Sequence, residues 1–240
     1  MQNSHVIDDE QVVPLQSFLI LLVSTIAGAF LAIEILPALL PGILATAGGE
    51  APKAYWYLSR SSAFAAYLLL WLSMSFGLII TNRMAQLWPG GPAAFDLHQH
   101  VSLLGIAFSF FHALILLGDQ YISPSLANLL VPFGLASYRP VWVGLGQLSI
   151  YLSLLVTLTF YARKRLGNRR WRTIHLFSYV AFLAVMLHGI FGGTDTSTVW
   201  AVGIYFTTGI SVVFLTLYRM LVVRMPQPSS RSERPVPRRA

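Results

Sequence analysis

Six long apolar stretches constrain the fold of this chain more than any other feature of its sequence. A helix that crosses a membrane needs about 20 mostly apolar residues. Stretches that meet this requirement cover about residues 15–36, 55–80, 97–117, 141–161, 173–191 and 199–222. Only 10% of the residues are charged, against about 25% in soluble domains. The sequence therefore predicts an all-α polytopic membrane bundle of six transmembrane helices.

Basic residues between the fourth and fifth spans set the predicted orientation. This loop contains Arg163, Lys164, Arg165, Arg169, Arg170 and Arg172. The end of the chain is also rich in arginine, whereas the loop between the fifth and sixth spans, GGTDTST, has no basic residue. Because basic loops remain in the cytoplasm, we expect both termini to be cytoplasmic. The third and fifth spans then run parallel, from the inside to the outside.

Five of the six histidines fall on only two of these spans. The third span holds His98, His100 and His112, and the fifth holds His175 and His188. At about 1.5 Å per residue, His112 lies roughly 21 Å deeper in the membrane than His98, and His188 lies roughly 20 Å deeper than His175. Since the spans run parallel, two pairs form at matched depths. We expect His98 to pair with His175 near the inner face, and His112 with His188 near the outer face.

Paired histidines at one depth suit a flat macrocycle that is held from both faces. Neutral imidazole ligates iron without adding charge to a low-dielectric interior, and two axial imidazoles are a ligand set of haem b. Six-coordinate iron favours electron transfer over oxygen binding, and two haems stacked across the membrane would connect its faces. The chain has no cysteine, which excludes thiolate-ligated clusters and covalent c-type haem.

Helical periodicity fits the third span better than the fifth. At about 100° per residue, the 14 steps from His98 to His112 return to within roughly 40° of the start, so these two share a face. The 13 steps from His175 to His188 leave roughly 140° on an ideal helix. We therefore expect a π-bulge, another distortion, or haems at different azimuths. His100 points about 160° from His98 and competes with it only if this helix begins irregularly.

Two arginines are candidate partners for anionic haem propionates. Arg60 lies within the second span, about one turn from its outer end, and Arg139 lies at the outer mouth of the fourth. Snorkelling to the interface is the alternative for both. Arg170 and Arg172 are placed similarly for an inner haem, although control of topology explains them better.

Four segments carry a resemblance to a known family. In chain order they read WYLSRSSAFAAYLLLWLSMSFGLI, LHQHVSLLGIAFSFFHALILL, SYRPVWVGLG and RRWRTIHLFSYVAFLAVMLHGIFGGTD. In their order and histidine spacings, residues 55–220 resemble the ferric reductase-like transmembrane domain family. That family is related to the membrane portion of NADPH oxidases and to the haem-binding membrane subunit of a periplasmic methionine sulfoxide reductase system. The resemblance implies two haems b, ligated by His98, His112, His175 and His188, and makes the 13-residue spacing normal.

The resemblance also implies a division of the chain and a need for redox partners. It predicts a haem-binding domain (55–223) that follows an extra transmembrane helix with its loop (15–54). The predicted orientation adds a cytoplasmic tail (1–14), and the Pro-, Ser- and Arg-rich composition adds a disordered basic tail (224–240). Reductase and oxidase relatives continue into a flavin- and NADPH-binding domain, whereas only the tail follows here. We therefore expect an electron-transfer subunit of the cell inner membrane. A separate flavoprotein or quinol would supply its electrons, and an outer acceptor would receive them.

Two other interpretations start from the same histidines. A quinone-reactive cytochrome b subunit of a larger complex would share the haems and differ in its partner. A haem-free transporter or proton relay would use the histidines directly, although Glu34 is the only acidic residue within a predicted span. The net charge of +7 lies mostly beside apolar spans, so we expect no nucleic-acid partner. The apolar segment 124–135 is too short to span and is predicted to be interfacial or re-entrant.

Overall fold

The structure, a computed structural model, describes residues 12–39, 54–82, 84 and 90–224. Within these residues every regular element is helical, and six helical spans are long and apolar enough to cross a membrane. They are α1 (Leu15–Leu39), α3 (Ala54–Thr81), α4 (Gly91–Ile115), α6 (Pro140–Tyr161), α8 (Asn168–His175) followed by α9 (Phe177–Gly192), and α10 (Val199–Arg224). The predicted all-α bundle with six spans is therefore confirmed. The predicted tails and the loop after α1 fall almost entirely outside the described residues.

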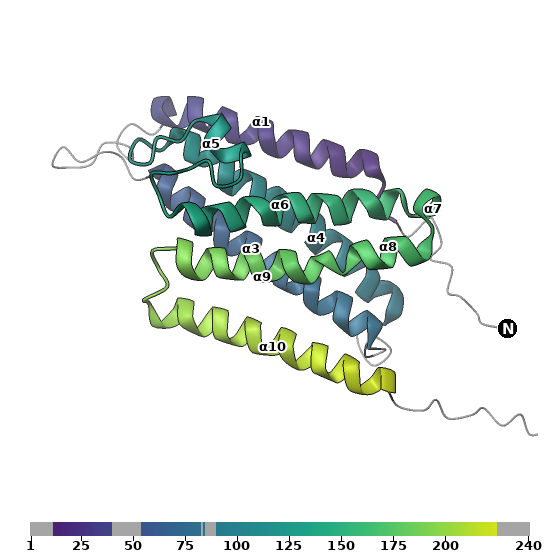
Figure 1. Ribbon diagram of the computed structural model, residues 1–240. Coiled ribbons are helices and arrows are strands. Elements are labelled where there is room, and N and C mark those ends of the chain that lie inside the picture. Colours follow the sequence, from purple (N-terminus) through teal and green to yellow (C-terminus); the bar gives the residue numbers. More distant parts are fainter. Residues whose placement is uncertain (1–11, 40–53, 83, 85–89, 225–240) are drawn as a thin grey trace, which may run out of the picture.

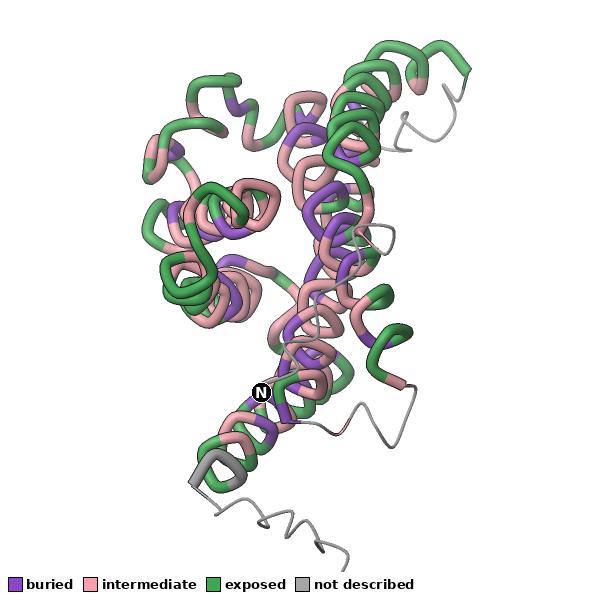
Figure 2. Tube along the Cα trace, turned by 90° about the vertical axis from the view of Figure 1, so that its right-hand side faces the viewer, coloured by how far each residue is buried: buried purple, intermediate pink, exposed green. Residues whose placement is uncertain are grey.

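The spanning helices lie side by side, with α1 and α10 at opposite edges of the bundle (Figure 1). The closest packing is between α3 and α4 and between α6 and α9. α1 packs on α4, and α10 packs on α3. Seen after a 90° turn, the exposed parts of the helices lie mostly on their outward sides (Figure 2). The core therefore consists of helix pairs that share buried faces, with the outer faces left for lipid.

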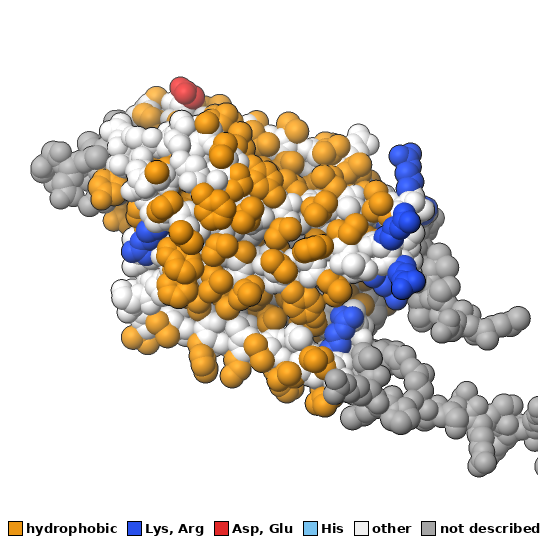
Figure 3. Space-filling view, in the orientation of Figure 1, with side chains coloured by type: hydrophobic (Ala, Val, Ile, Leu, Met, Phe, Trp, Pro, Cys, Tyr) orange, Lys and Arg blue, Asp and Glu red, His pale blue; other side chains and the backbone are white. Residues whose placement is uncertain are grey.

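Large apolar side chains cover the surface between the two ends of the bundle, and basic side chains gather at one end (Figure 3). The basic end is where α7 (Arg163–Leu166) and α8 lie. An apolar band with charged residues at its margin is the surface that a bilayer requires. The surface and the six apolar helices together support a multi-pass membrane protein.

Interhelical hydrogen bonds attach α10 to α3 inside the apolar bundle. The hydroxyl of Tyr67 lies 2.5 Å from that of Thr208, and Trp71 Nε1 donates to Ser211 Oγ at 2.8 Å. Such bonds contribute about 0.6–2 kcal/mol each between membrane helices. Tyr67 also belongs to the buried cluster that α3, α9 and α10 share. This packing fixes α9, and with it His188, relative to α3.

α1 continues two residues past Pro37 and ends three residues beyond the end of the first span expected from the sequence, which lies at about residue 36. A proline inside a helix has no N–H to donate to the carbonyl four residues earlier, here that of Ile33. The structure supplies another donor to this carbonyl, the hydroxyl of Tyr55 on α3. A satisfied carbonyl allows the helix to continue in an apolar environment.

The apolar segment after α4 folds back against α6 instead of spanning. It contains the short helix α5 (Leu126–Leu130). The side chain of Gln147 donates to the carbonyls of Asn128 and Leu129 at 2.7 and 2.9 Å, and accepts from the N–H of Phe133 at 2.9 Å. One buried glutamine on α6 therefore anchors this segment, which is short and non-spanning as predicted.

Candidate functional site

Two pairs of histidine rings lie inside the bundle at different depths. The ring centroids of His98 and His175 are 6.2 Å apart, with planes inclined by 68°. Those of His112 and His188 are 6.1 Å apart, with planes inclined by 62°. α4 contributes one ring to each pair, and the span formed by α8 and α9 contributes the other. The structure thus brings together the four predicted histidines in the two predicted pairs.

The spacing of the rings agrees with that of two imidazoles on opposite sides of one metal atom. A metal–imidazole bond is about 2.0 Å long, and the ring centroid lies about 1.1 Å behind the ligating nitrogen, which places two such centroids about 6 Å apart. Edge-to-face rings without a metal also pack at about 4.5–7 Å. Ring spacing alone therefore suits both a metal-bound pair and a metal-free packed pair. A metal-bound pair also requires each ring to keep one nitrogen unprotonated, so the positions of the ring protons matter as well.

Backbone carbonyls fix the proton on Nδ1 in three of the four rings. The distances from Nδ1 to the carbonyl oxygen are 2.8 Å for His98 and Ser73, 2.8 Å for His112 and Ser59, and 2.9 Å for His188 and Trp142. A carbonyl oxygen only accepts, so Nδ1 donates, and in the neutral ring Nε2 keeps the lone pair. A metal-ligating histidine is normally oriented in this way, by a bond from its other nitrogen.

His175 is the exception among the four. Its Nδ1 is buried and has no hydrogen-bond partner within the described part of the chain. Its ring packs against Trp171, one turn earlier on α8, with centroids 5.4 Å apart. Aromatic packing, not a hydrogen bond, therefore positions this ring.

A tightened turn in the fifth span explains how the 13-residue spacing is accommodated. α8 ends at His175 and α9 begins at Phe177. The N–H of Leu176 donates to the carbonyl of Thr173 at 3.2 Å, and that of Tyr179 to the carbonyl of Leu176 at 3.1 Å. Both are bonds of the 3₁₀ type, in which each residue turns by about 120°. Three such steps reduce the offset between the rings from roughly 140° to roughly 80°. The distortion that the sequence predicts is present, and it is not a π-bulge.

Glycines make room for two of the rings. A Cβ on Gly146 of α6 would lie 2.8 Å from the ring of His188, which is closer than real Cβ contacts allow. A Cβ on Gly77 of α3 would lie 3.3 Å from Cε1 of His98. The neighbouring Gly144 similarly admits the ring of Phe133 from the α5 segment. The GLG sequence of α6 is therefore a packing feature with a different neighbour for each glycine.

Sequence reasoning missed the residues that orient the histidines. Ser59 and Ser73 of α3 are 14 residues apart, as are His98 and His112 of α4, and the two helices are antiparallel. One register of the helix pair therefore places a serine carbonyl opposite each histidine. The matched spacing of serines and histidines could have predicted these two contacts from the sequence. The contact of His188 with the carbonyl of Trp142 could not be predicted in this way, because any residue type offers a backbone carbonyl.

Both candidate arginines bond to the end of α9 or to the residues directly after it, close to the His112–His188 level. Arg60 Nε donates to Asp195 Oδ2 at 2.7 Å, and its Nη2 also contacts Asp195 Oδ1. Arg139, whose φ of 40° is left-handed, donates from Nη1 to the carbonyls of Phe191 at 2.6 Å and Gly193 at 3.2 Å. The arginines therefore tie the end of α9 to α3 and to the start of α6.

Tyr138, beside Arg139, adds a further bond at the end of α9. Its hydroxyl donates to the carbonyl of Gly192 at 3.1 Å. Burial raises the pKa of Tyr138 above its usual value, although the neighbouring Arg139 opposes the shift. The hydroxyl therefore stays protonated at neutral pH and keeps the hydrogen that it donates.

The remaining predicted side chains lie outside the two pairs. His100 is exposed, and its Nδ1 lies 2.9 Å from the carbonyl and 3.2 Å from the carboxylate of Asp96. Arg170 and Arg172 are exposed on α8. The structure thus places His98, and not His100, opposite His175.

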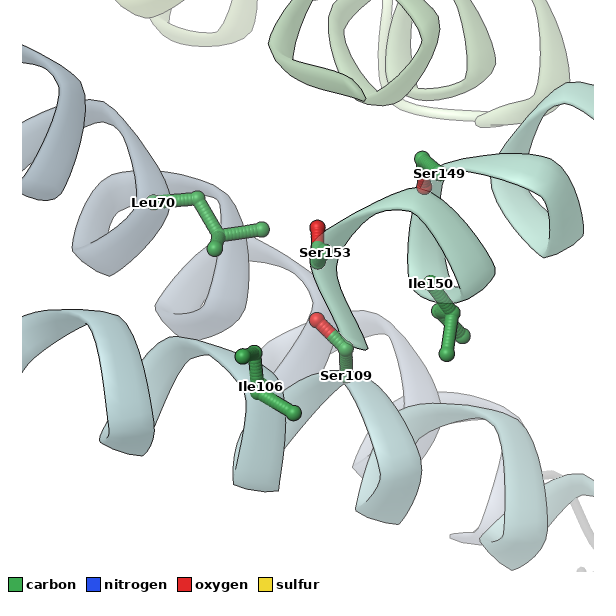
Figure 4. A pocket seen from close by; sticks show the side chains of 6 residues that line it. All are labelled: Leu70, Ile106, Ser109, Ser149, Ile150 and Ser153. Carbon is green, nitrogen blue, oxygen red and sulfur yellow. The ribbon is translucent and has the colours of Figure 1, made fainter. Parts of the chain in front are cut away.

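A small pocket lies among α3, α4 and α6. Its lining residues are Leu70, Ile106, Ser109, Ser149, Ile150 and Ser153 (Figure 4). The hydroxyls of Ser109 and Ser149 donate to carbonyls of their own helices. On α4 the lining residues fall between His98 and His112, so the pocket belongs to the depth that separates the two pairs.

Comparisons of the chain with family models, with curated proteins and with solved structures yield no match. The function is therefore argued from the geometry of the site.

Proposed function

We propose that this chain is a b-type cytochrome that moves electrons across a membrane through two bis-histidine haems, and that it belongs to the ferric reductase-like transmembrane family. The axial ligand pairs are His98 with His175 and His112 with His188. The observation that carries the proposal is the joint geometry of the two pairs. Both have the ring spacing of a bis-imidazole metal site, and three of the four rings have Nδ1 held by a carbonyl.

The residues present suit the chemistry of the group that they would hold. Haem supplies reversible one-electron transfer when it is bound. The chain supplies neutral imidazoles, orients them through Nδ1, and surrounds them with apolar helices that exclude water. Gly77 and Gly146 leave space beside two of the rings. None of these features requires a charged group inside the bundle.

The distribution of basic side chains supports the proposed orientation of the chain, with electrons entering at the cytoplasmic end. Seven Lys and Arg side chains lie on α7, on α8 and near the end of α10: Arg163, Lys164, Arg165, Arg169, Arg170, Arg172 and Arg219. By the positive-inside rule this end faces the cytoplasm, and the proposed membrane is the cell inner membrane. A separate donor, a flavoprotein or quinol, delivers electrons at this end, next to His175. An outer acceptor takes them at the end where Arg60 pairs with Asp195.

Arg60 and Arg139 are proposed partners of the outer haem's propionates. A guanidinium has five N–H donors, and Arg139 uses one nitrogen for both of its carbonyl bonds. Arg60 is already neutralised by Asp195. A propionate at Arg60 would therefore share or replace the carboxylate that the structure places there.

A haem-free transporter is less well supported. Metal transport and proton relay use clusters of ionisable side chains or a polar path. Among the described residues no group of three or more His, Asp or Glu side chains comes together. The histidines instead stand in isolated pairs, with one nitrogen of most rings already bonded to a carbonyl.

A reduced-minus-oxidised absorption spectrum of the purified chain tests the proposal. We expect the α-band of a low-spin b-type haem. Co-purification of a second subunit would instead identify a quinone-reactive cytochrome b subunit of a larger complex. A spectrum without any haem band would contradict the proposal and leave the transporter.

A further inference from the structure

The two histidine pairs receive unequal numbers of hydrogen bonds. We propose that this inequality gives the His112–His188 site the lower reduction potential, and that the hydroxyl of Ser59 is a positioning residue that lowers it. The inference rests on the proposed function, because it concerns haem iron held by these histidines. It follows from the contacts of α3 with α4, because each of the two buried α4 histidines lies against a serine of α3.

The two serines support their histidines identically through the backbone. The carbonyl oxygen of Ser59 lies 2.8 Å from Nδ1 of His112, and that of Ser73 lies 2.8 Å from Nδ1 of His98. Both serine–histidine contacts arise from one antiparallel register of α3 against α4. The surroundings of His98 and His112 can therefore be compared directly. Any difference between the two α4 histidines must come from groups other than these carbonyls.

The serine hydroxyls differ. Ser59 Oγ lies 2.8 Å from Nδ1 of His112 and donates its own hydrogen to the carbonyl of His112 at 3.0 Å. Its lone pair is therefore a second acceptor for the Nδ1–H of His112. Ser73 Oγ lies 3.5 Å from Nδ1 of His98 and only 2.6 Å from Ser102 Oγ. The hydroxyl of Ser73 is thus engaged with Ser102.

The partner rings differ in the same direction. Nδ1 of His188 donates to the carbonyl of Trp142 at 2.9 Å, whereas Nδ1 of His175 is buried without a partner in the described residues. The His112–His188 pair therefore has three acceptors within 2.9 Å, and the His98–His175 pair has one.

An acceptor on Nδ1–H makes the imidazole a stronger electron donor through Nε2. A stronger donor stabilises the ferric state, which carries one more positive charge than the ferrous state, and so lowers the potential. Since the acceptors are concentrated at His112–His188, that site is the more difficult to reduce. The hydroxyl of Ser59 is the one acceptor there that a substitution can remove without changing the backbone.

The test is a redox titration of the haem-loaded full chain, followed by its absorption spectrum. Wild type should titrate in two steps, and Ser59→Ala should raise the lower one. Loss of about one hydrogen bond changes the equilibrium constant for reduction about fivefold, which is roughly 40 mV for a one-electron couple. Ser73→Ala is the matched comparison and should shift its step by clearly less, because the hydroxyl of Ser73 lies 3.5 Å from Nδ1 of His98. Unchanged potentials in Ser59→Ala, or an equal shift in Ser73→Ala, would overturn the inference.

Haem content separates the failure of this inference from failure of the proposed function. A wild-type chain without haem contradicts the function itself. A chain with two haems and no Ser59 effect contradicts only the unequal tuning. If Ser59→Ala loses haem, Ser59→Thr is titrated instead, because it keeps the hydroxyl. Wild-type potentials in Ser59→Thr then support the role of the hydroxyl, and shifted potentials contradict it.

Discussion

Gly146 of α6 gives His188 of α9 the space that its ring occupies: a Cβ on Gly146 would lie 2.8 Å from that ring. Gly146→Ala should therefore displace the ring and remove about half of the bound haem. Gly203→Ala is the control, because a Cβ on this α10 glycine meets nothing within 4 Å. Haem content per purified chain measures both. Equal haem in the two variants would show that the contact does not matter for binding.

The bond from Tyr55 to the carbonyl of Ile33 should stabilise the docking of α1. Tyr55→Phe leaves that carbonyl, already without its helical donor because of Pro37, unpaired in an apolar environment. We expect a loss of about 1–2 kcal/mol in unfolding free energy. Unfolding in detergent measures it, with the exposed Tyr57→Phe as control. Equal unfolding free energies of the two variants would show that this hydrogen bond does not stabilise the protein.

Arg60 has two proposed partners, a propionate and Asp195, and paired variants separate them. Arg60→Gln should reduce retention of the outer haem, because a cation next to the propionate is lost. Asp195→Asn should retain it, since a freed guanidinium still serves the propionate. Haem retention during dilution in detergent measures both. Equal loss in the two variants would mean that Arg60 acts only through its ion pair with Asp195.

The absence of cysteine allows the orientation to be measured directly. Asn168→Cys lies on exposed α8, and Ser197→Cys lies on the exposed loop before α10. A membrane-impermeant thiol reagent should label Cys at position 197 in intact cells. Position 168 should be labelled only after the membrane is opened. The reverse pattern would place the basic end outside and reverse the proposed direction of transfer.

The sequence predicts the spans and the histidine pairs because both depend on local periodicity and depth. Apolar length defines α3, α6 and α10, and parallel orientation of two spans matches His98 with His175. The contacts that hold the rings depend on tertiary packing. The register of α3 against α4 places Ser59 beside His112, and in the sequence this register is indicated by the matched 14-residue spacings of the two serines and the two histidines. The continuation of α1 past Pro37 likewise depends on Tyr55, which is distant in sequence.

The tightened turn at Leu176 shows a different limit. The 13-residue spacing predicts that the fifth span departs from an ideal helix, but no glycine or proline lies between His175 and His188 to locate the departure. The structure places it directly after His175. The ion pair of Arg60 with Asp195 was also not predicted, because it joins residues 135 positions apart.

Haem quantitation on three histidine variants tests the central claim most directly. The chain should bind two haems b, and His98→Ala and His112→Ala should each lose about half. His100→Ala should lose none, because His100 is exposed and lies outside both pairs. Full haem content in His98→Ala and His112→Ala, or a loss confined to His100→Ala, would contradict the two bis-histidine sites.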